Sequence, residues 1–252
     1  METYYLFVFF IFGLVFGSFF NVVGYRLPLK MSLIKPASHC PQCDHKLTAL
    51  ELIPVFSYLF QGGKCKNCGK KIPIFYPIFE TCTGLIFALI YYNYGLTIKT
   101  FIYILFASMI LITIISDVLY MVISDEVLIF FGSIIFIISV INGESVLNLI
   151  LNMLIPFLSM LLLKVVGDAV FKKESLGGGD IKLMLIFGLV LGYQLSLFSV
   201  VLAAFIALPI SVINLKKQGE HILPFGPYLG ISALIFIILK IDALKIISML
   251  GI

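Results

Sequence analysis

The sequence predicts an all-α polytopic membrane protein, and two observations carry that prediction. Hydrophobic residues make up 61% of the 252 residues and charged residues only 12%, whereas a soluble domain is about half apolar and about a quarter charged. The apolar residues also gather into runs close to the roughly 20 residues that a membrane-spanning helix needs. Because one soluble core cannot bury this much apolar surface, the chain needs lipid as its solvent.

About eight apolar runs are predicted to form transmembrane helices. They cover roughly residues 1–23, 74–92, 98–116, 122–141, 146–168, 181–194, 196–214 and 226–250. The first run lacks the basic start and the cleavage site of a secretory signal, so we expect it to be retained. The predicted domains are a first span at 1–25, a polar loop at 26–73 and a transmembrane helical core at 74–252. Within the loop, the apolar stretch 50–60 is too short to cross a bilayer, and it packs either on the membrane surface or on the loop itself.

The basic residues predict an orientation. Eight spans with both chain ends outside the cytosol collect most of them on one side, namely Arg26, Lys30, Lys35, Lys46, Lys64, Lys66, Lys70, Lys71, Lys164, Lys172, Lys173, Lys182, Lys216 and Lys217. Only Lys99, Lys240 and Lys245 fall on the other side. Because positive residues favour the cytosolic side, the polar loop is predicted there. The net charge of +4 is small and forms no basic stripe with interleaved aromatic residues, so nucleic acid is not an expected partner.

The polar loop contains two C-x-x-C units, Cys40/Cys43 and Cys65/Cys68, with 21 residues between them. This approximates the spacing of a four-cysteine zinc ribbon, in which the thiolates surround one tetrahedral ion. The alternative is two disulfides, which a cytosolic location disfavours. Four thiolates leave no open coordination position, so this zinc is expected to be structural. The fifth cysteine, Cys82, is expected to be buried in the core.

Two aspartates lie at the ends of predicted spans, where acids are candidates for function. Asp117 follows an apolar run, and Asp180 follows Gly177-Gly178-Gly179 and precedes the next span. Each also has a structural interpretation, because Asp180 is a suitable N-cap and Asp117 could be a solvated charge at the end of a span. Together with the glycine run, which permits close approach of a peptide, the pair favours catalysis.

Two nearby carboxyl groups cannot both ionise easily, so one keeps its proton. One group can then activate a water while the other protonates a carbonyl oxygen. The sequence has no G-x-S-x-G or H-E-x-x-H motif to suggest another mechanism. His39 and His45 flank the first cysteine pair as loop residues or spare ligands, and His221 has no evident partner.

These motifs, in this order, resemble the type IV prepilin peptidases of the GxGD aspartic protease class. The matching elements are Gly17-Ser18-Phe19-Phe20-Asn21 with Arg26-Leu27-Pro28, the four cysteines with Gly62-Gly63-Lys64, Tyr76-Pro77 with Glu80, Asp117 followed eight residues later by Asp125, Gly177-Gly178-Gly179-Asp180-Ile181-Lys182, and Pro224-Phe225-Gly226-Pro227-Tyr228. In this family Pro usually precedes the second acid of the first aspartate motif, but here Ser124 does. Loss of Pro is expected to loosen that turn but removes no proposed catalytic group. Asp125 is expected to support the site or to cap the next helix.

The resemblance implies a multi-pass enzyme of the bacterial inner membrane, with Asp117 and Asp180 as the catalytic pair at the cytosolic face. It would cut the leader of pilin or pseudopilin precursors after a glycine. It would then methylate the new N-terminus with S-adenosyl-L-methionine as the methyl donor. The resemblance gives no residue for binding this cofactor, and Glu80 is only a candidate for methyl transfer.

Three alternative functions fit parts of the sequence. The first is a peptidase without methyltransferase activity, which the long cysteine loop disfavours. The second is a proton-coupled transporter that uses Asp117 and Asp180 as a relay, but transporters place such acids near the middle of the bilayer. The third is a zinc-ribbon scaffold on a membrane anchor, which leaves the glycine run without a purpose.

Overall fold

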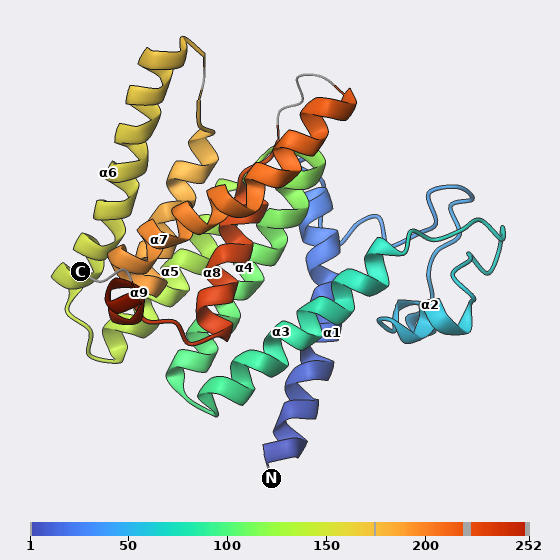
Figure 1. Cartoon of the computed structure of the whole chain (residues 1–252). Helices are drawn as coiled ribbons and strands as arrows, with labels where there is room; N and C mark the ends of the chain where they lie inside the picture. Colours follow the sequence, from blue (N-terminus) through green and yellow to red (C-terminus); the bar gives the residue numbers. More distant parts are fainter. Residues whose placement is uncertain (1, 174, 219–222, 250–252) are drawn as a thin grey trace. The chain divides into compact units, whose positions relative to one another are not determined.

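A computed structural model describes residues 2–173, 175–218 and 223–249. Within these ranges the regular structure is helical (Figure 1), apart from two isolated β-bridges in the cysteine loop. The elements are α1 (Glu2–Arg26), the 3-10 helix η1 (Ala49–Leu52), α2 (Phe56–Phe60), α3 (Phe75–Tyr94), α4 (Ile98–Tyr120), α5 (Asp125–Ile141), α6 (Val146–Phe171), α7 (Gly178–Gln218), α8 (Gly226–Ile238) and α9 (Ala243–Met249). The predicted all-α class is confirmed.

The chain forms two compact units, Met1–Leu96 and Thr97–Ile252. The boundary places α3 in one unit with α1 and the cysteine loop. The division predicted from the sequence, with residues 74–252 as one transmembrane core, stays a prediction.

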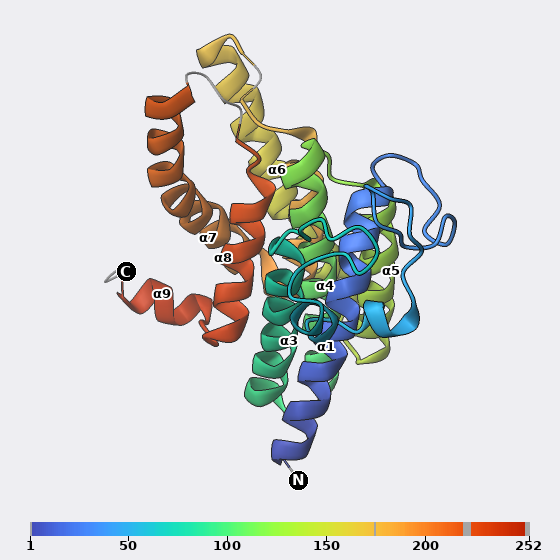
Figure 2. The same ribbon diagram turned by 90° about the vertical axis from the view of Figure 1, so that its right-hand side faces the viewer.

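In the first unit, α1 and α3 lie side by side, as both views show (Figures 1 and 2). Glycines permit this close crossing, because a Cβ atom on Gly13 would lie 2.6 Å from the Cα of Gly84. Small residues serve the same purpose at many helix crossings in membranes. Farther along the pair, the rings of Phe9 and Tyr91 stack with their centroids 4.7 Å apart. The first unit is therefore a tight helix pair that carries the cysteine loop.

In the second unit, α4 supplies much of the core. Phe106 of α4 is fully buried and meets Phe187 of α7 edge to face, with ring centroids 5.2 Å apart. Ile110 of α4 packs on Gly230 of α8, where an added Cβ would lie 2.6 Å from Ile110 Cγ2. Helix α7 is interrupted at Gly192, whose φ of 76° and ψ of 162° are not helical. The two predicted runs 181–194 and 196–214 are thus the two parts of α7.

Five of the described helices are long and apolar enough to cross a membrane: α1, α3, α4, α6 and α7 as far as Ile213. Helix α5 has 17 residues and α8 has 13, so they extend about 26 Å and about 20 Å. A hydrocarbon core is about 30 Å thick. Each predicted run corresponds to helical structure, but the count of eight crossings stays a prediction.

The prediction of one continuous run over 226–250 is wrong. Helix α8 ends at Ile238, and α9 begins only at Ala243. Lys240 takes a left-handed conformation with φ of 50°, and the Ile241 N–H donates to the Phe236 carbonyl at 3.0 Å. This is the hydrogen bond of a helix C-cap, and it stops α8 although the flanking residues on both sides are apolar.

Candidate active site and candidate metal centre

Asp117 lies in the last turn of α4, and only 6% of its surface is exposed. Its Oδ2 atom accepts a hydrogen bond of 3.1 Å from the N–H of Gly226, the first residue of α8. A helix N-terminus carries a partial positive charge and free N–H groups, so it favours a carboxylate there. A Cβ atom on Gly226 would lie 2.6 Å from the same Oδ2 atom. Glycine at position 226 therefore lets the backbone reach the acid.

Asp180 lies in the first turn of α7, directly after the glycine run, and is 8% exposed. The three glycines differ in their surroundings. A Cβ on Gly179 would lie 2.9 Å from Ile123 Cβ, one on Gly177 would lie 3.1 Å from Asp180 Oδ2, and one on Gly178 would meet open space. A larger residue would therefore press on Ile123 at position 179 and on Asp180 at position 177, whereas position 178 has room for a side chain.

Ile123 joins the surroundings of the two aspartates. It lies in the connection between α4 and α5 and contacts the position of Gly179, while its Cδ1 atom would lie 3.4 Å from a Cβ on Gly226. The Asp117 and Asp180 carboxyl groups are close enough to interact electrostatically. The structure thus brings together the predicted pair. Ile123 was missed by sequence reasoning, because an isoleucine between two apolar helices gives no distinguishing signal.

A second contact joins the same two motifs. Lys182 Nζ donates to both oxygens of Asp125 at 2.8 Å. Asp125 is the first residue of α5, and the side chains of Lys182 and Asp125 are each about half exposed. A surface ion pair contributes little to stability. This one links the start of α5 to the start of α7. The Ser124 N-cap before Asp125 makes no side-chain capping bond.

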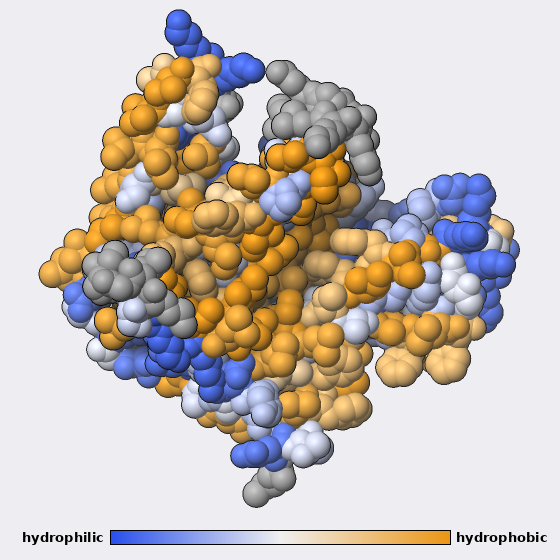
Figure 3. Space-filling view, viewed as in Figure 1, coloured by the Kyte–Doolittle hydropathy of each residue, from blue (hydrophilic) through white to orange (hydrophobic). Residues whose placement is uncertain are grey.

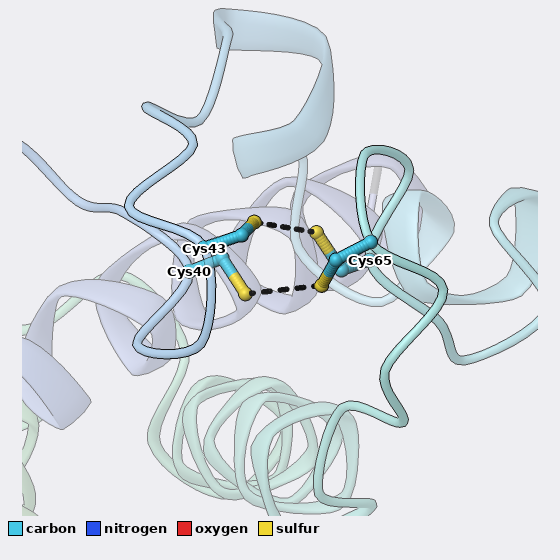
Figure 4. A group of neighbouring side chains, drawn as sticks. Cys40, Cys43 and Cys65 are labelled. Atoms are coloured by element: carbon cyan, nitrogen blue, oxygen red, sulfur yellow. Dashed lines mark hydrogen bonds between the residues drawn. The ribbon is translucent and has the colours of Figure 1, made fainter.

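The four paired cysteines of the first unit converge on one point (Figure 4). Their sulfur atoms all lie within 4.8 Å of one another, and the Cys40–Cys68 and Cys43–Cys65 distances are both 3.9 Å. A disulfide needs about 2.05 Å. Tetrahedral zinc with Zn–S bonds of about 2.3 Å requires sulfur atoms about 3.8 Å apart. The quartet therefore has the size of a zinc site, and it could hold such an ion.

Hydrogen bonds favour the thiolate at two of the four cysteines, Cys43 and Cys65. The Asn67 amide lies 3.6 Å from the Cys43 sulfur and is the main cause that lowers the pKa of Cys43 to about 6. Backbone N–H groups of Cys68 and Asn67 lower the pKa of Cys65. Deprotonated sulfur is the form that binds a metal. At Cys68 a backbone bond from Lys70 is outweighed by burial and by the neighbouring Cys43, Cys65 and Cys40, which together raise the pKa of Cys68 to about 11. The hydrogen bonds therefore prepare two of the four thiols for a metal.

The histidines near the quartet act as loop residues. His45 Nε2 lies 3.2 Å from Glu51 Oε2, and His39 Nδ1 lies 2.9 Å from the Ala37 carbonyl. Neither histidine belongs to the group of side chains that could hold a metal ion. Hydrogen bonds from the N–H and hydroxyl of Thr48, with His45 in addition, lower the pKa of Glu51 to about 2. His221 and the side chains of Lys216 and Lys217 lie outside the described residues.

A buried acid attaches the cysteine loop to the helix pair. Glu80 of α3 is 7% exposed, and its Oε2 accepts a hydrogen bond of 2.8 Å from the Val55 N–H. The Glu80 carboxylate also accepts a hydrogen bond from the Ser18 side chain. Arg26 is also buried and donates to the carbonyl of Ser32 at 3.1 Å. Sequence reasoning singled out Glu80 without this partner, since a contact with a backbone N–H leaves no sequence signal.

The expectation for Cys82 is wrong, because the residue is exposed rather than buried. It lies on α3, one of the helices apolar enough to span a membrane. An apolar thiol on the outward side of such a helix meets lipid, so the preference of cysteine for soluble cores does not apply here.

Comparison with known proteins gives two family matches. The Bacterial Peptidase A24 N-terminal domain matches residues 11–94, and the Type IV leader peptidase family matches residues 104–212. These ranges fall within the first and second compact units respectively.

Several relatives carry the name prepilin leader peptidase/N-methyltransferase. The one from Bacillus subtilis (strain 168) is 35% identical over 233 residues, which are 90% of this chain and 92% of the relative. The one from Neisseria gonorrhoeae is 31% identical over 249 residues, or 87% and 85% of the two chains. No solved structure matches the chain.

Proposed function

This chain belongs to the type IV leader peptidase family, and on that basis we propose that it removes the leader of pilin-like precursors with Asp117 and Asp180 as its catalytic pair. The observation that carries the proposal is the meeting of two buried aspartates from separate motifs in one unit. Membrane helices rarely hold an acid without a functional reason.

In the proposed reaction the two carboxyl groups share one proton. One carboxylate accepts a proton from water as the water attacks the carbonyl carbon of the leader glycine. The other carboxyl group donates its proton to the carbonyl oxygen as negative charge develops there. The C–N bond of this tetrahedral intermediate then breaks: the first carboxyl group gives its proton to the leaving amine, and the second takes back the proton of the hydroxyl group as the glycine carboxyl group forms. The Gly226 N–H holds Asp117 in position through its hydrogen bond. The Lys182–Asp125 pair links the start of α7, which carries Asp180, to the start of α5.

We assign the first unit to the second activity named in the relatives, N-methylation of the new N-terminus. S-adenosyl-L-methionine would supply the methyl group. Cys40, Cys43, Cys65 and Cys68 would hold a structural Zn²⁺ that folds the loop. Glu80 stays a candidate for this part, and its bonds to Val55 and Ser18 support a role in holding the loop.

The proposed location is the bacterial inner membrane, with the aspartates and the cysteine loop at the cytosolic face. The lysines of the loop support this orientation through the positive-inside rule. The substrates would be prepilins or pseudopilins, whose leaders reach the same face.

The test uses purified protein in liposomes with a pilin precursor. Wild-type protein is expected to shorten the precursor, whereas Asp117→Asn and Asp180→Asn are each expected to leave it intact. Processing by either variant at the wild-type rate would remove that residue from the mechanism.

Methyl transfer is tested separately with labelled S-adenosyl-L-methionine. Label on the processed N-terminus is expected from wild-type protein, whereas active cleavage without label would leave a peptidase only. The Asp117→Asn variant, given precursor that has already been cleaved, is expected to retain methylation. Loss of both activities in that variant would contradict the assignment to separate units.

A further inference from the structure

The cysteine loop has an apolar surface that its own fold leaves uncovered. We define the apolar edge as Leu50, Leu52, Ile53, Phe56, Leu59 and Phe60. Neither η1 nor α2 contains a buried residue, and the exposed fractions reach 76% at Leu50 and 88% at Phe60. Of the two sequence-based alternatives for residues 50–60, packing on the loop itself therefore does not describe this edge.

The edge lies at the depth where a membrane-spanning helix begins. The N–H of Val55, between η1 and α2, donates to Glu80. Glu80 is the sixth residue of α3, about 8 Å along the helix axis from its start. The first turns of α3 already expose Phe75 and Ile78, at 47% and 53%. Since each interfacial layer of a bilayer is roughly 5–8 Å thick, this contact holds α2 at the level of the lipid headgroups.

The rest of the loop has the charge that suits an anionic lipid surface. Its basic residues outnumber its two acids, Asp44 and Glu51; they are Arg26, Lys30, Lys35, Lys46, Lys64, Lys66, Lys70 and Lys71. Figure 3 shows hydrophilic residues along the upper and outer side of the segment that contains α2, and hydrophobic residues along its lower side. An apolar side and a lysine-rich polar side are the two features of a segment that lies in a membrane interface.

We propose that the apolar edge is a membrane-interface anchor, which inserts into the headgroup and upper acyl region of the bilayer that α1 and α3 cross. The partner is a lipid surface containing anionic lipids, which attract the surrounding lysines. The anchor keeps the four-cysteine site at the membrane surface.

The absence of tryptophan from the chain makes a direct test available. Phe60→Trp introduces a single tryptophan at the most exposed position of the edge, and tryptophan can be excited selectively over the 12 tyrosines of the chain. The full-length protein is placed in nanodiscs of phosphatidylcholine and phosphatidylglycerol whose acyl chains carry bromine at a shallow or a deep position. Matched reference variants are Phe7→Trp on the exposed side of α1, 62% exposed, and Lys46→Trp on the polar part of the loop.

We expect the indole of Phe60→Trp to emit at shorter wavelength in nanodiscs and to be quenched more by shallow than by deep bromine. Phe7→Trp is expected to be quenched in lipid, and Lys46→Trp is expected to be quenched by aqueous acrylamide instead. Leu50→Trp provides a second position on the edge and is expected to follow Phe60→Trp. Replacing phosphatidylglycerol with phosphatidylcholine is expected to weaken the bromine quenching of the tryptophans at positions 60 and 50.

Two outcomes would overturn the proposal. Short-wavelength emission from both edge variants without bromine quenching would mean that protein, either another part of the chain or a second copy, covers the edge. Ready quenching of both by acrylamide would place the edge in water. Equal bromine quenching with and without anionic lipid would refute the role of the lysines. None of these readouts depends on peptidase or methyltransferase activity, so they stand apart from the proposed function.

Discussion

A single methyl group at position 226 should disable the peptidase while leaving the fold in place. In Gly226→Ala the new Cβ would lie 2.6 Å from Asp117 Oδ2, closer than a carbon atom and a carboxylate oxygen can approach. Asp117 must then move away and weaken its 3.1 Å bond to the N–H at 226. Hydrogen bonds to charged groups contribute about 1.5–3 kcal/mol. At about 1.4 kcal/mol for each factor of ten, kcat/KM should fall roughly 10- to 150-fold.

The matched control is Gly178→Ala, which adds the same methyl group next to Asp180 but in open space. It is expected to retain activity within a factor of about three, since surface substitutions change stability by about 0.5 kcal/mol or less. Both variants are compared with wild type by cleavage of a pilin precursor and by thermal unfolding in detergent. If the two variants lose activity equally, or if Gly226→Ala is fully active, the geometry inferred around Asp117 is wrong.

Other predictions concern the ion pair and the cysteine loop. Lys182→Asp and Asp125→Lys should each lower the cleavage rate while the Tm stays near that of the wild type. The double exchange restores an ion pair and should recover part of the lost cleavage rate. Equal rates in the single and double variants would show that the pair does not position the helices. Cys40→Ser should reduce the zinc content measured by atomic absorption and expose the loop to proteolysis, because three thiolates hold the ion less tightly; unchanged zinc would refute the quartet. Glu51 has its pKa lowered from 4.5 to about 2, so its contribution is complete above about pH 4.5 and disappears as the pH falls through about 2. Hydrogen exchange of the Thr48 amide should therefore be faster in Glu51→Gln than in wild type at pH 6, and this difference should vanish toward pH 2.

The sequence predicts the helices and the cysteine quartet well, for different reasons. Apolar runs mark helices because each must face lipid, and the two C-x-x-C units specify four ligands by their spacing alone. The end of α8 was not predictable in this way, because hydropathy does not change enough near Lys240 to reveal its left-handed backbone. A helix end in an apolar region depends on local capping, which composition does not encode.

The surroundings of the aspartates were only partly predictable. The motifs marked Asp117 and Asp180, but not Ile123, which contacts glycine positions in α7 and α8. Such a contact depends on three segments distant in sequence, and an isoleucine is as suitable for lipid as for a packed site. The Glu80–Val55 bond was hidden for a related reason. A backbone N–H is present at nearly every position, so nothing in the residue type marks its partner.

The bond between Glu80 and Val55 also sets an order of events during synthesis. The ribosome delivers both cysteine pairs and α2 before it delivers α3, which carries the carboxylate that holds them. At roughly 5–20 residues per second, the interval from Val55 to Glu80 is about 1–5 seconds. During that time the nascent loop has its thiols but no place to dock. The helix pair closes only when Gly84 reaches Gly13, so membrane insertion of α3 is the step that completes assembly of the first half of the enzyme.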